Sequence, residues 1–220
     1  MKYKKGNKRL PLFNAKERSD PVMEYMERYT EHYSTDNCFA EPTARVVATG
    51  GALHLLELSG RQAPGWIGRL GTGLASLNVN ILRGRAVKKS ALEWSAWLEL
   101  DFFEATREAD KIDYLRMSAD TLTPPGSYNL TLESFKLSMS NKHNGSLHVE
   151  ICGSDRIGFL ASLLNMYSLY SLHPVEIEIE TRDKKIHDRF WLKGMGGVIP
   201  SESSVSAVSD RLSVCRLTPN

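Results

Sequence analysis

A single supersecondary pattern is written twice in this chain, about ninety residues apart, and this repetition limits the possible folds more than any other feature. In the first copy an apolar strand leads into a loop that ends in Pro64-Gly65, then into a helix and a strand that opens at residues 77–82. The second copy runs from a strand at residues 147–151 through a short loop and a helix to a strand at residues 175–179. The repetition predicts two similar modules in tandem.

The first module is expected to follow the order βαββαβ. Its first helix is predicted at residues 65–77, where apolar residues recur at helical spacing. Three glycines inside this helix indicate close approach of another backbone, because each costs about 1 kcal/mol relative to Ala. Strands are predicted at residues 54–58, 79–88 and 91–102. A helix near residues 104–117 and a strand near residues 130–139 complete the module.

The second module repeats this order with a helix at residues 158–170 and strands at residues 147–152, 174–181 and 185–193. Asp183-Lys184 offers a tight turn between the last two strands. That turn sets a register with three facing pairs on a solvated outer face, namely Glu176 with Trp191, Glu178 with Arg189, and Glu180 with His187.

The end of the chain leaves little sequence for a fourth strand in the second module. Ser201 can cap a last helix, after which only residues 214–217 remain. This strand is therefore expected to be short or supplied by a neighbour. Because an open sheet edge attracts another strand, a homodimer is predicted.

The N-terminal segment differs from the rest of the chain in charge. Residues 1–18 hold seven Lys or Arg and one Glu, whereas the remainder holds 21 basic and 25 acidic residues. A short amphipathic helix is expected at about residues 21–33, with Pro21 at its first position. The α+β chain is thus expected to consist of a basic arm with a short helix at 1–45 and two ferredoxin-like modules at 46–140 and 141–220, each with an antiparallel four-stranded sheet.

Cysteine usage and hydropathy predict a cytoplasmic protein. Three cysteines are an odd number, and their spacing does not match a zinc site, which favours reduced thiols. The basic N-terminus lacks the apolar segment of a signal peptide. Residues 157–175 are uncharged and about long enough to span a bilayer, but they contain several Ser residues, Asn, His and Pro. They are expected to form a helix of a soluble core, with no membrane partner.

With these elements in place, the two copies resemble ACT domains, the small βαββαβ ligand-binding modules of amino-acid biosynthetic enzymes and nitrogen regulators. The resemblance rests on Pro64-Gly65 after a strand, on Asn80-Ile81, and on residues 155–160 and 187–192 of the second copy. The second copy is most similar to the ACT modules of the bacterial uridylyltransferase that reports glutamine. The architecture, two modules without an enzyme domain, is similar to the glycine cleavage transcriptional repressor.

The loops before the two helices are the predicted ligand sites. Gly65 and Gly158 open helices whose first N–H groups lack internal partners and therefore attract a carboxylate. The resemblance implies that an amino acid supplies this carboxylate, and that Asn80 holds its polar end together with Gln62. The position equivalent to Asn80 in the second copy is His173. The candidate ligand-binding residues are Gln62, Pro64, Gly65, Asn80, Asp155, Arg156, Gly158 and His173.

Each candidate also has a structural interpretation that needs no ligand. These interpretations are a helix start for Pro64-Gly65, a loop cap for Asn80, an exposed ion pair for Asp155-Arg156, and a loop position for His173. The chain also departs from the amino-acid-binding members of the family, because it has Gly60 and Gln62 where they place His and Asn.

The predicted function is that of a non-enzymatic regulatory protein that binds a small metabolite and signals through a partner. No catalytic residue, metal or cofactor is expected, because the sequence contains no phosphate loop, nucleophile elbow or metal-ligand spacing. The alternative is a nucleic-acid-binding or protein-interaction scaffold of the same βαββαβ type. Nucleic acid is disfavoured because the aromatic run of RNA-binding sheets is absent and the body is acidic.

Overall fold

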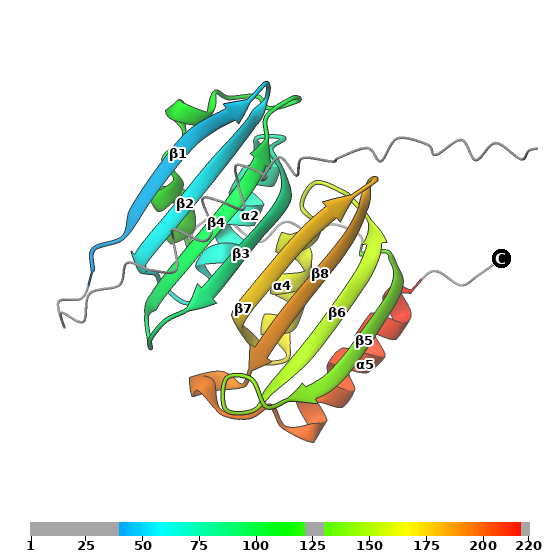
Figure 1. Cartoon of the computed structure of the whole chain (residues 1–220). Helices are drawn as coiled ribbons and strands as arrows, with labels where there is room; N and C mark the ends of the chain where they lie inside the picture. The colour runs from blue at the N-terminus through cyan, green and yellow to red at the C-terminus, as the bar shows by residue number, and fades with distance from the viewer. Residues whose placement is uncertain (1–39, 122–129, 217–220) are drawn as a thin grey trace, which may run out of the picture. The chain divides into compact units, whose positions relative to one another are not determined.

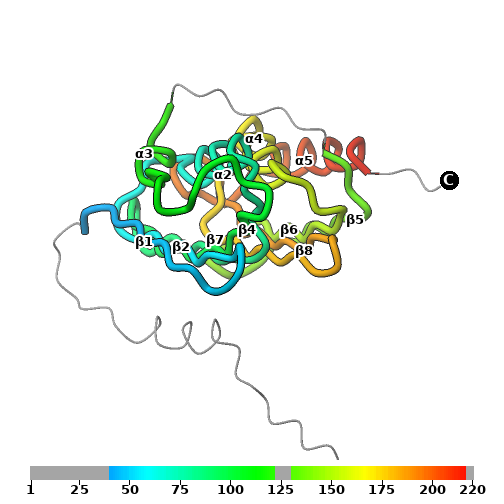
Figure 2. The backbone as a smooth tube through the Cα atoms, turned by 90° about the horizontal axis from the view of Figure 1, so that it is seen from above, coloured from blue at the N-terminus to red at the C-terminus, as the bar shows by residue number. Residues whose placement is uncertain are grey.

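The computed structural model describes residues 40–121 and 130–216, which form an α+β structure with one antiparallel sheet (Figure 1). The described strands follow the order β1-β2-β4-β3-β7-β8-β6-β5. The helices α2 to α5 all cover the same face of this sheet (Figure 2). The elements are β1 Thr43–Gly50, β2 Leu53–Arg61, α2 Trp66–Ser76, β3 Asn80–Lys88, β4 Glu93–Asp101, the 3-10 turn η1 Ala109–Lys111, α3 Tyr114–Ala119, β5 Leu132–Ser140, β6 Ser146–Ser154, α4 Phe159–Leu169, β7 His173–Arg182, β8 Lys185–Lys193, η2 Met195–Gly197 and α5 Glu202–Cys215.

The same element order, β-β-α-β-β-α, occurs in residues 43–119 and again in residues 132–215, here called the first and second halves. The α+β class and the antiparallel pairing are confirmed, whereas each half has the order ββαββα in place of the expected βαββαβ. The expectation of two four-stranded sheets is corrected, because β3 pairs with β7 and joins the halves into one sheet. The expected arm and helix of residues 1–33 lie outside the described residues. None of the described helices has the length and apolar character that crossing a bilayer requires.

The strand expected to complete the first module belongs to the second half. Among the described strands β5 pairs with β6 alone, to which a tight turn at residues 141–145 joins it, so the boundary at 140 falls in a hairpin. Strand β1, which was not predicted, fills the edge beside β2. Residues 214 and 215 belong to α5, and Arg216 makes only an isolated bridge to Leu132. The second half therefore has its fourth strand, and the homodimer stays a prediction that rests on the outer strands β1 and β5 and on the helix-free face.

The hairpin of the second half was predicted correctly. Asp183 and Lys184 have φ values of 50° and 61°, the left-handed conformation that tight hairpin turns require. The resulting register pairs Glu176 with Trp191 and Glu178 with Arg189, as the sequence indicated.

Two glycines of α2 face helix α4 of the second half. A Cβ at Gly71 would lie 3.5 Å from the Cβ of Ala161 in α4, and one at Gly68 would lie 3.7 Å from the Cβ of Leu164. A methyl group would therefore fit at either position at ordinary contact distance, so the approach of α4 does not require these two glycines. A Cβ at Gly73 would overlap Met117, so this glycine makes room for α3.

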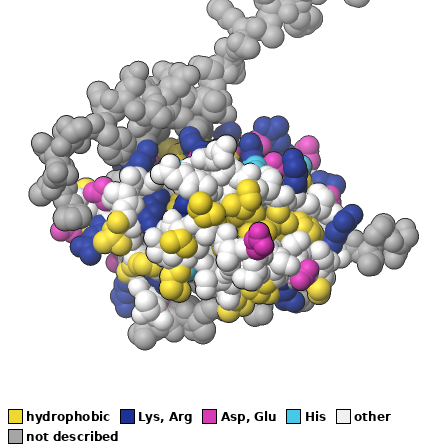
Figure 3. All heavy atoms as spheres, turned by 90° about the horizontal axis from the view of Figure 1, so that it is seen from below, with side chains coloured by type: hydrophobic (Ala, Val, Ile, Leu, Met, Phe, Trp, Pro, Cys, Tyr) yellow, Lys and Arg dark blue, Asp and Glu magenta, His cyan; other side chains and the backbone are white. Residues whose placement is uncertain are grey.

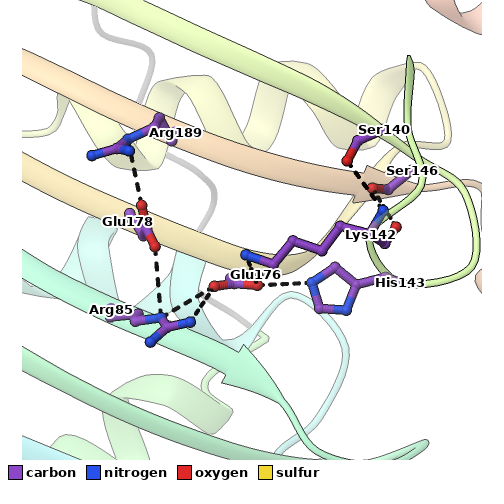
Figure 4. A network of polar contacts seen from close by, with 8 residues as sticks. All are labelled: Arg85, Ser140, Lys142, His143, Ser146, Glu176, Glu178 and Arg189. Atoms are coloured by element: carbon purple, nitrogen blue, oxygen red, sulfur yellow. Dashed lines mark hydrogen bonds and ion pairs between the residues drawn. The ribbon is translucent and has the colours of Figure 1, made fainter. Parts of the chain in front are cut away.

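The helix-free face of the sheet is not fully solvated as expected, because Glu176 is buried there with 1% of its side chain exposed. Its carboxylate binds Arg85 of β3 at 2.6 Å, and Lys142 and His143 of the β5–β6 turn at 2.7 and 2.8 Å (Figure 4). Burial alone would raise the pKa of Glu176, but hydrogen bonds from Lys142, Arg85 and His143 together lower it to about 2. This carboxylate therefore ties both halves and one turn together.

Replacing Glu176 by Gln removes the charge that Arg85 and Lys142 bind, and is expected to lower the free energy of unfolding by about 2 kcal/mol at pH 7. The loss is not larger because both cations keep access to water. The folded-state pKa lies below the ordinary value of 4.5, so the contribution is complete above that pH and is lost as the pH falls toward 2. Urea unfolding at pH 7, 5 and 3 measures this difference, with Glu178→Gln as the control. A difference that does not shrink with falling pH would contradict the assignment.

Candidate functional site

Two cavities lie where the halves meet, at equivalent positions of the repeat. The larger has a volume of about 720 Å³ and the smaller of about 30 Å³, close to the space of one water. In each, the loop before the helix of one half faces the start of a strand of the other half. This arrangement follows from the β3–β7 pairing, which sets the two repeats side by side with opposite strand directions.

The structure divides the predicted site residues between these cavities. The larger is lined by Gln62, Pro64 and Gly65 of the first half and by His173 of the second. The smaller is lined by Asn80, Asp155, Arg156 and Gly158. The expected grouping of Asn80 with Gly65 and Gln62 is therefore wrong, because the start of β3 meets the loop of the opposite half.

The smaller cavity is closed by a hydrogen bond between the halves. The side-chain nitrogen of Asn80 donates to Asp155 Oδ2 at 2.7 Å, and the backbone N–H of Ile81 donates to Asn80 Oδ1 at 3.0 Å. Asn80 thus has both ends of its amide bonded. Burial raises the pKa of Asp155, and the hydrogen bond from Asn80 opposes this rise. Burial also raises the pKa of the neighbouring Asp188, to about 7. The side chains of Asn80 and Asp155 therefore bond each other and are not available to a ligand.

The larger cavity is surrounded by buried side-chain donors without a protein partner. Gln62 and Trp66 are 5% and 1% exposed, and neither the Gln62 Nε2 nor the Trp66 Nε1 has an acceptor. Arg69 Nη2 and Asn165 Nδ2 also lack partners. Buried polar groups are nearly always hydrogen-bonded in proteins, so this cluster makes the larger cavity the candidate ligand site.

Three of these four residues were missed by the sequence reasoning. Two signals were available in the sequence. Trp66 directly follows Pro64-Gly65, and Asn165 is a carboxamide residue on the largely apolar helix α4. Arg69 lies one helical turn after Gly65 and binds the carbonyl oxygens of Pro64 and Ser118, both at 2.8 Å. It also borders a neighbouring hollow of about 320 Å³ in the first half.

Glycines occupy two walls of the larger cavity, at the start of α2 and in the segment after β8. Gly65 has φ 78° at the start of α2, where any side chain would be strained, and the equivalent Gly158 has φ 83°. Residues 194–197 form a Gly-rich segment at the opposite wall. Beside it the exposed apolar side chains are Met195, Val198 and Ile199. Figure 3 shows hydrophobic side chains gathered on the face seen from below, to which η2 belongs in Figure 1.

Electrostatics also distinguish the larger cavity. Burial lowers the pKa of His173, and the charge of Lys88 lowers it further, so this imidazole is neutral at pH 7. Burial lowers the pKa of Arg69, and Asp120 opposes this effect. Among residues 40–121 and 130–216, no group of three His, Cys, Asp or Glu side chains is placed to hold a metal ion.

Comparison with solved structures finds a weak structural likeness. No protein-family model and no curated protein matches the chain. The chain is similar to the crystal structure of aspartate kinase from Synechocystis, with a TM-score of 0.40 and 18% identity over 74% of this chain. It spans 27% of that protein's length. Such a likeness assigns neither a family nor an activity to the chain.

Replacing Asn80 by Ala is expected to destabilise the fold by about 1 to 2 kcal/mol, because Asp155 loses its partner across the junction. The double variant with Asp155→Ala is expected to cost less than the sum of the two single changes, as for any directly bonded pair. Urea unfolding of the four proteins measures this coupling. Additive losses would mean that the bond does not hold the halves together.

Proposed function

We propose that this chain is a non-enzymatic regulatory protein that binds a small carboxylate-bearing metabolite, the class to which amino acids belong, in the larger cavity. The observation that carries this proposal is the set of buried donors without partners at Gln62, Trp66, Arg69 and Asn165. Leaving such a group unsatisfied costs about 1 to 3 kcal/mol, which a ligand with acceptor atoms would recover.

The start of α2 favours a carboxylate beside these donors. By their position in the first turn, the N–H groups of Ile67 and Gly68 have no acceptor within the helix, and both residues line the cavity. The backbone N–H of Trp66 is already bonded to Ala63 at 3.1 Å. Partial positive charge at a helix start stabilises a negative group at this place.

A ligand in this cavity would touch both halves of the molecule. Gln62 and Trp66 belong to the first half, whereas Asn165 and His173 belong to the second. Binding would therefore stabilise one placement of the halves over others, which is how a bound metabolite can change the surface offered to a partner protein. A homodimer and a regulatory partner belong to this proposal as the routes by which occupancy would be reported.

The alternative of an RNA-binding sheet is disfavoured by the helix-free face. RNA-recognition sheets stack bases on exposed aromatic rings. Here Trp191 is only 8% exposed, because it stacks on His148 with ring centroids 4.7 Å apart and lies under Lys142 Nζ at 3.7 Å. These contacts occupy the ring face that a base would need.

Thermal unfolding with millimolar amino acids and other small carboxylic acids tests the proposal on the full chain. A ligand at one hundred times its Kd is expected to stabilise the protein by about 2.7 kcal/mol. Ser168→Trp, which places a large side chain at an exposed lining position of the larger cavity, is expected to abolish the response. Arg156→Trp, the matched control at the exposed lining of the smaller cavity, is expected to keep it.

Two outcomes would contradict the proposal. If no compound raises the melting temperature, the cavity does not bind this class of metabolite and the scaffold alternative is favoured. If the two plugged variants lose the response equally, the ligand site is not the larger cavity.

A further inference from the structure

The two cavities differ in the sign of their charge. Among the described residues that line the larger cavity there is no Asp or Glu, whereas Arg69, Lys88 and Lys193 all line it. The smaller cavity is lined by Asp155 and Asp188 beside one arginine. Equivalent sites of the repeat thus have opposite character, and only the larger one has room for a ligand.

Several backbone oxygens at or beside the larger cavity are already bonded within the protein. Arg69 donates to the carbonyls of Pro64 and Ser118, and the hydroxyl of Thr72 donates to the carbonyl of Gly68 at 2.9 Å. In α4, the hydroxyl of Ser168 donates to the carbonyl of Asn165 at 2.7 Å. Lys193 Nζ binds three carbonyls of the β5–β6 turn, from His143, Asn144 and Gly145.

The groups that still lack partners are chiefly donors. The indole N–H of Trp66 and the guanidinium of Arg69 can only donate, and the guanidinium also adds positive charge to the wall. The carboxamides of Gln62 and Asn165 can turn either end toward a ligand and do not change that sign. The rest of the wall is apolar, with Trp66, Trp94, Leu164, Leu172, Pro174 and Val175.

An ammonium group fits this environment poorly. A buried ammonium needs acceptors or an opposite charge, and burying it without them is costly. A carboxylate, in contrast, accepts from the Trp66 indole and lies in the positive field of Arg69 and Lys88. A free amino acid would bring an ammonium group to a wall whose described residues offer it carboxamide and imidazole acceptors but no carboxylate.

We propose that the larger cavity selects an organic anion with an apolar body and no ammonium group, such as a 2-oxo acid, over the corresponding amino acid. This inference rests on the proposed function, because it concerns the same cavity. It replaces the amino acid expected from the sequence with a ligand of the same skeleton in which an oxo group stands for the ammonium. Lys88, at the end of β3, lines the cavity and is partly exposed, so its charge can be reversed without removing a core side chain.

Calorimetric titration of the full chain with matched pairs tests the inference. The probes are phenylpyruvate against phenylalanine and 4-methyl-2-oxopentanoate against leucine, with 3-phenylpropionate as an anion that lacks both the oxo and the ammonium group. The oxo acid of each pair is expected to bind at least about tenfold more tightly than the amino acid, the factor that corresponds to about 1.4 kcal/mol. The 3-phenylpropionate anion is expected to bind more tightly than phenylalanine.

A charge reversal tests the same inference through a ratio of affinities, which a general loss of stability does not imitate. Lys88→Glu brings a carboxylate into the wall and is expected to reduce the preference for the oxo acid at least fivefold, roughly the effect of one nearby opposite charge. Lys89→Glu makes the same change in net charge at the adjacent position outside the cavity lining and is expected to leave the preference unchanged.

The outcomes separate this inference from the proposed function. If amino acids bind as tightly as their oxo acids and Ser168→Trp abolishes that binding, the selection for an anion is wrong and the binding site stands. Equal effects of Lys88→Glu and Lys89→Glu on the ratio would also overturn the selection. If neither member of any pair binds, both proposals fail.

Discussion

The antiparallel pairing of β3 with β7 is the interaction on which the rest of the structure depends. It places Arg85 opposite Glu178, two residues that occupy the same position of the repeat, 93 residues apart. It also sets Arg83 against Glu180. Two first halves paired in this way would set Arg85 against Arg85, and two second halves would set Glu178 against Glu178, which like-charge repulsion disfavours. The charges of these strands therefore select the pairing of unlike halves, and both cavities exist because of it.

The same junction explains why two copies of one site have come to differ. Where the loop of the second half meets β3, Asn80 and Asp155 bond each other and leave space for about one water. Where the loop of the first half meets β7, the equivalent residues are Gln62 and His173, and no bond between them is formed across a cavity of about 720 Å³. One site thus stabilises the junction, while the other has the volume and the donors for a ligand. Each cavity combines the loop of one half with the strand start of the other half, so the two cavities are built from different residues and can have different roles.

Local signals predicted the parts of the fold that depend on neighbouring residues. The Asp183-Lys184 turn, the register of β7 with β8 and the glycines that open α2 and α4 were all readable from the sequence. The pairing of β5 with β6 was not readable, because the sequence alone does not decide which half a strand at the boundary completes. The partner of Asn80 and the burial of Glu176 arise from contacts across the junction, and the unpaired state of the Trp66 indole appears only when its whole surroundings are known.

The central claim, that the Trp66 indole N–H meets the acceptor group of a ligand, has a direct spectroscopic test. The chain contains four tryptophans, so ¹⁵N-labelled protein gives four indole N–H resonances, of which Trp66 is assigned with the Trp66→Phe variant. On titration with phenylpyruvate, the Trp66 proton resonance should move downfield as the carboxylate accepts its bond, while that of Trp191 on the helix-free face stays in place. A Trp66 resonance that does not move while the compound binds would contradict the account.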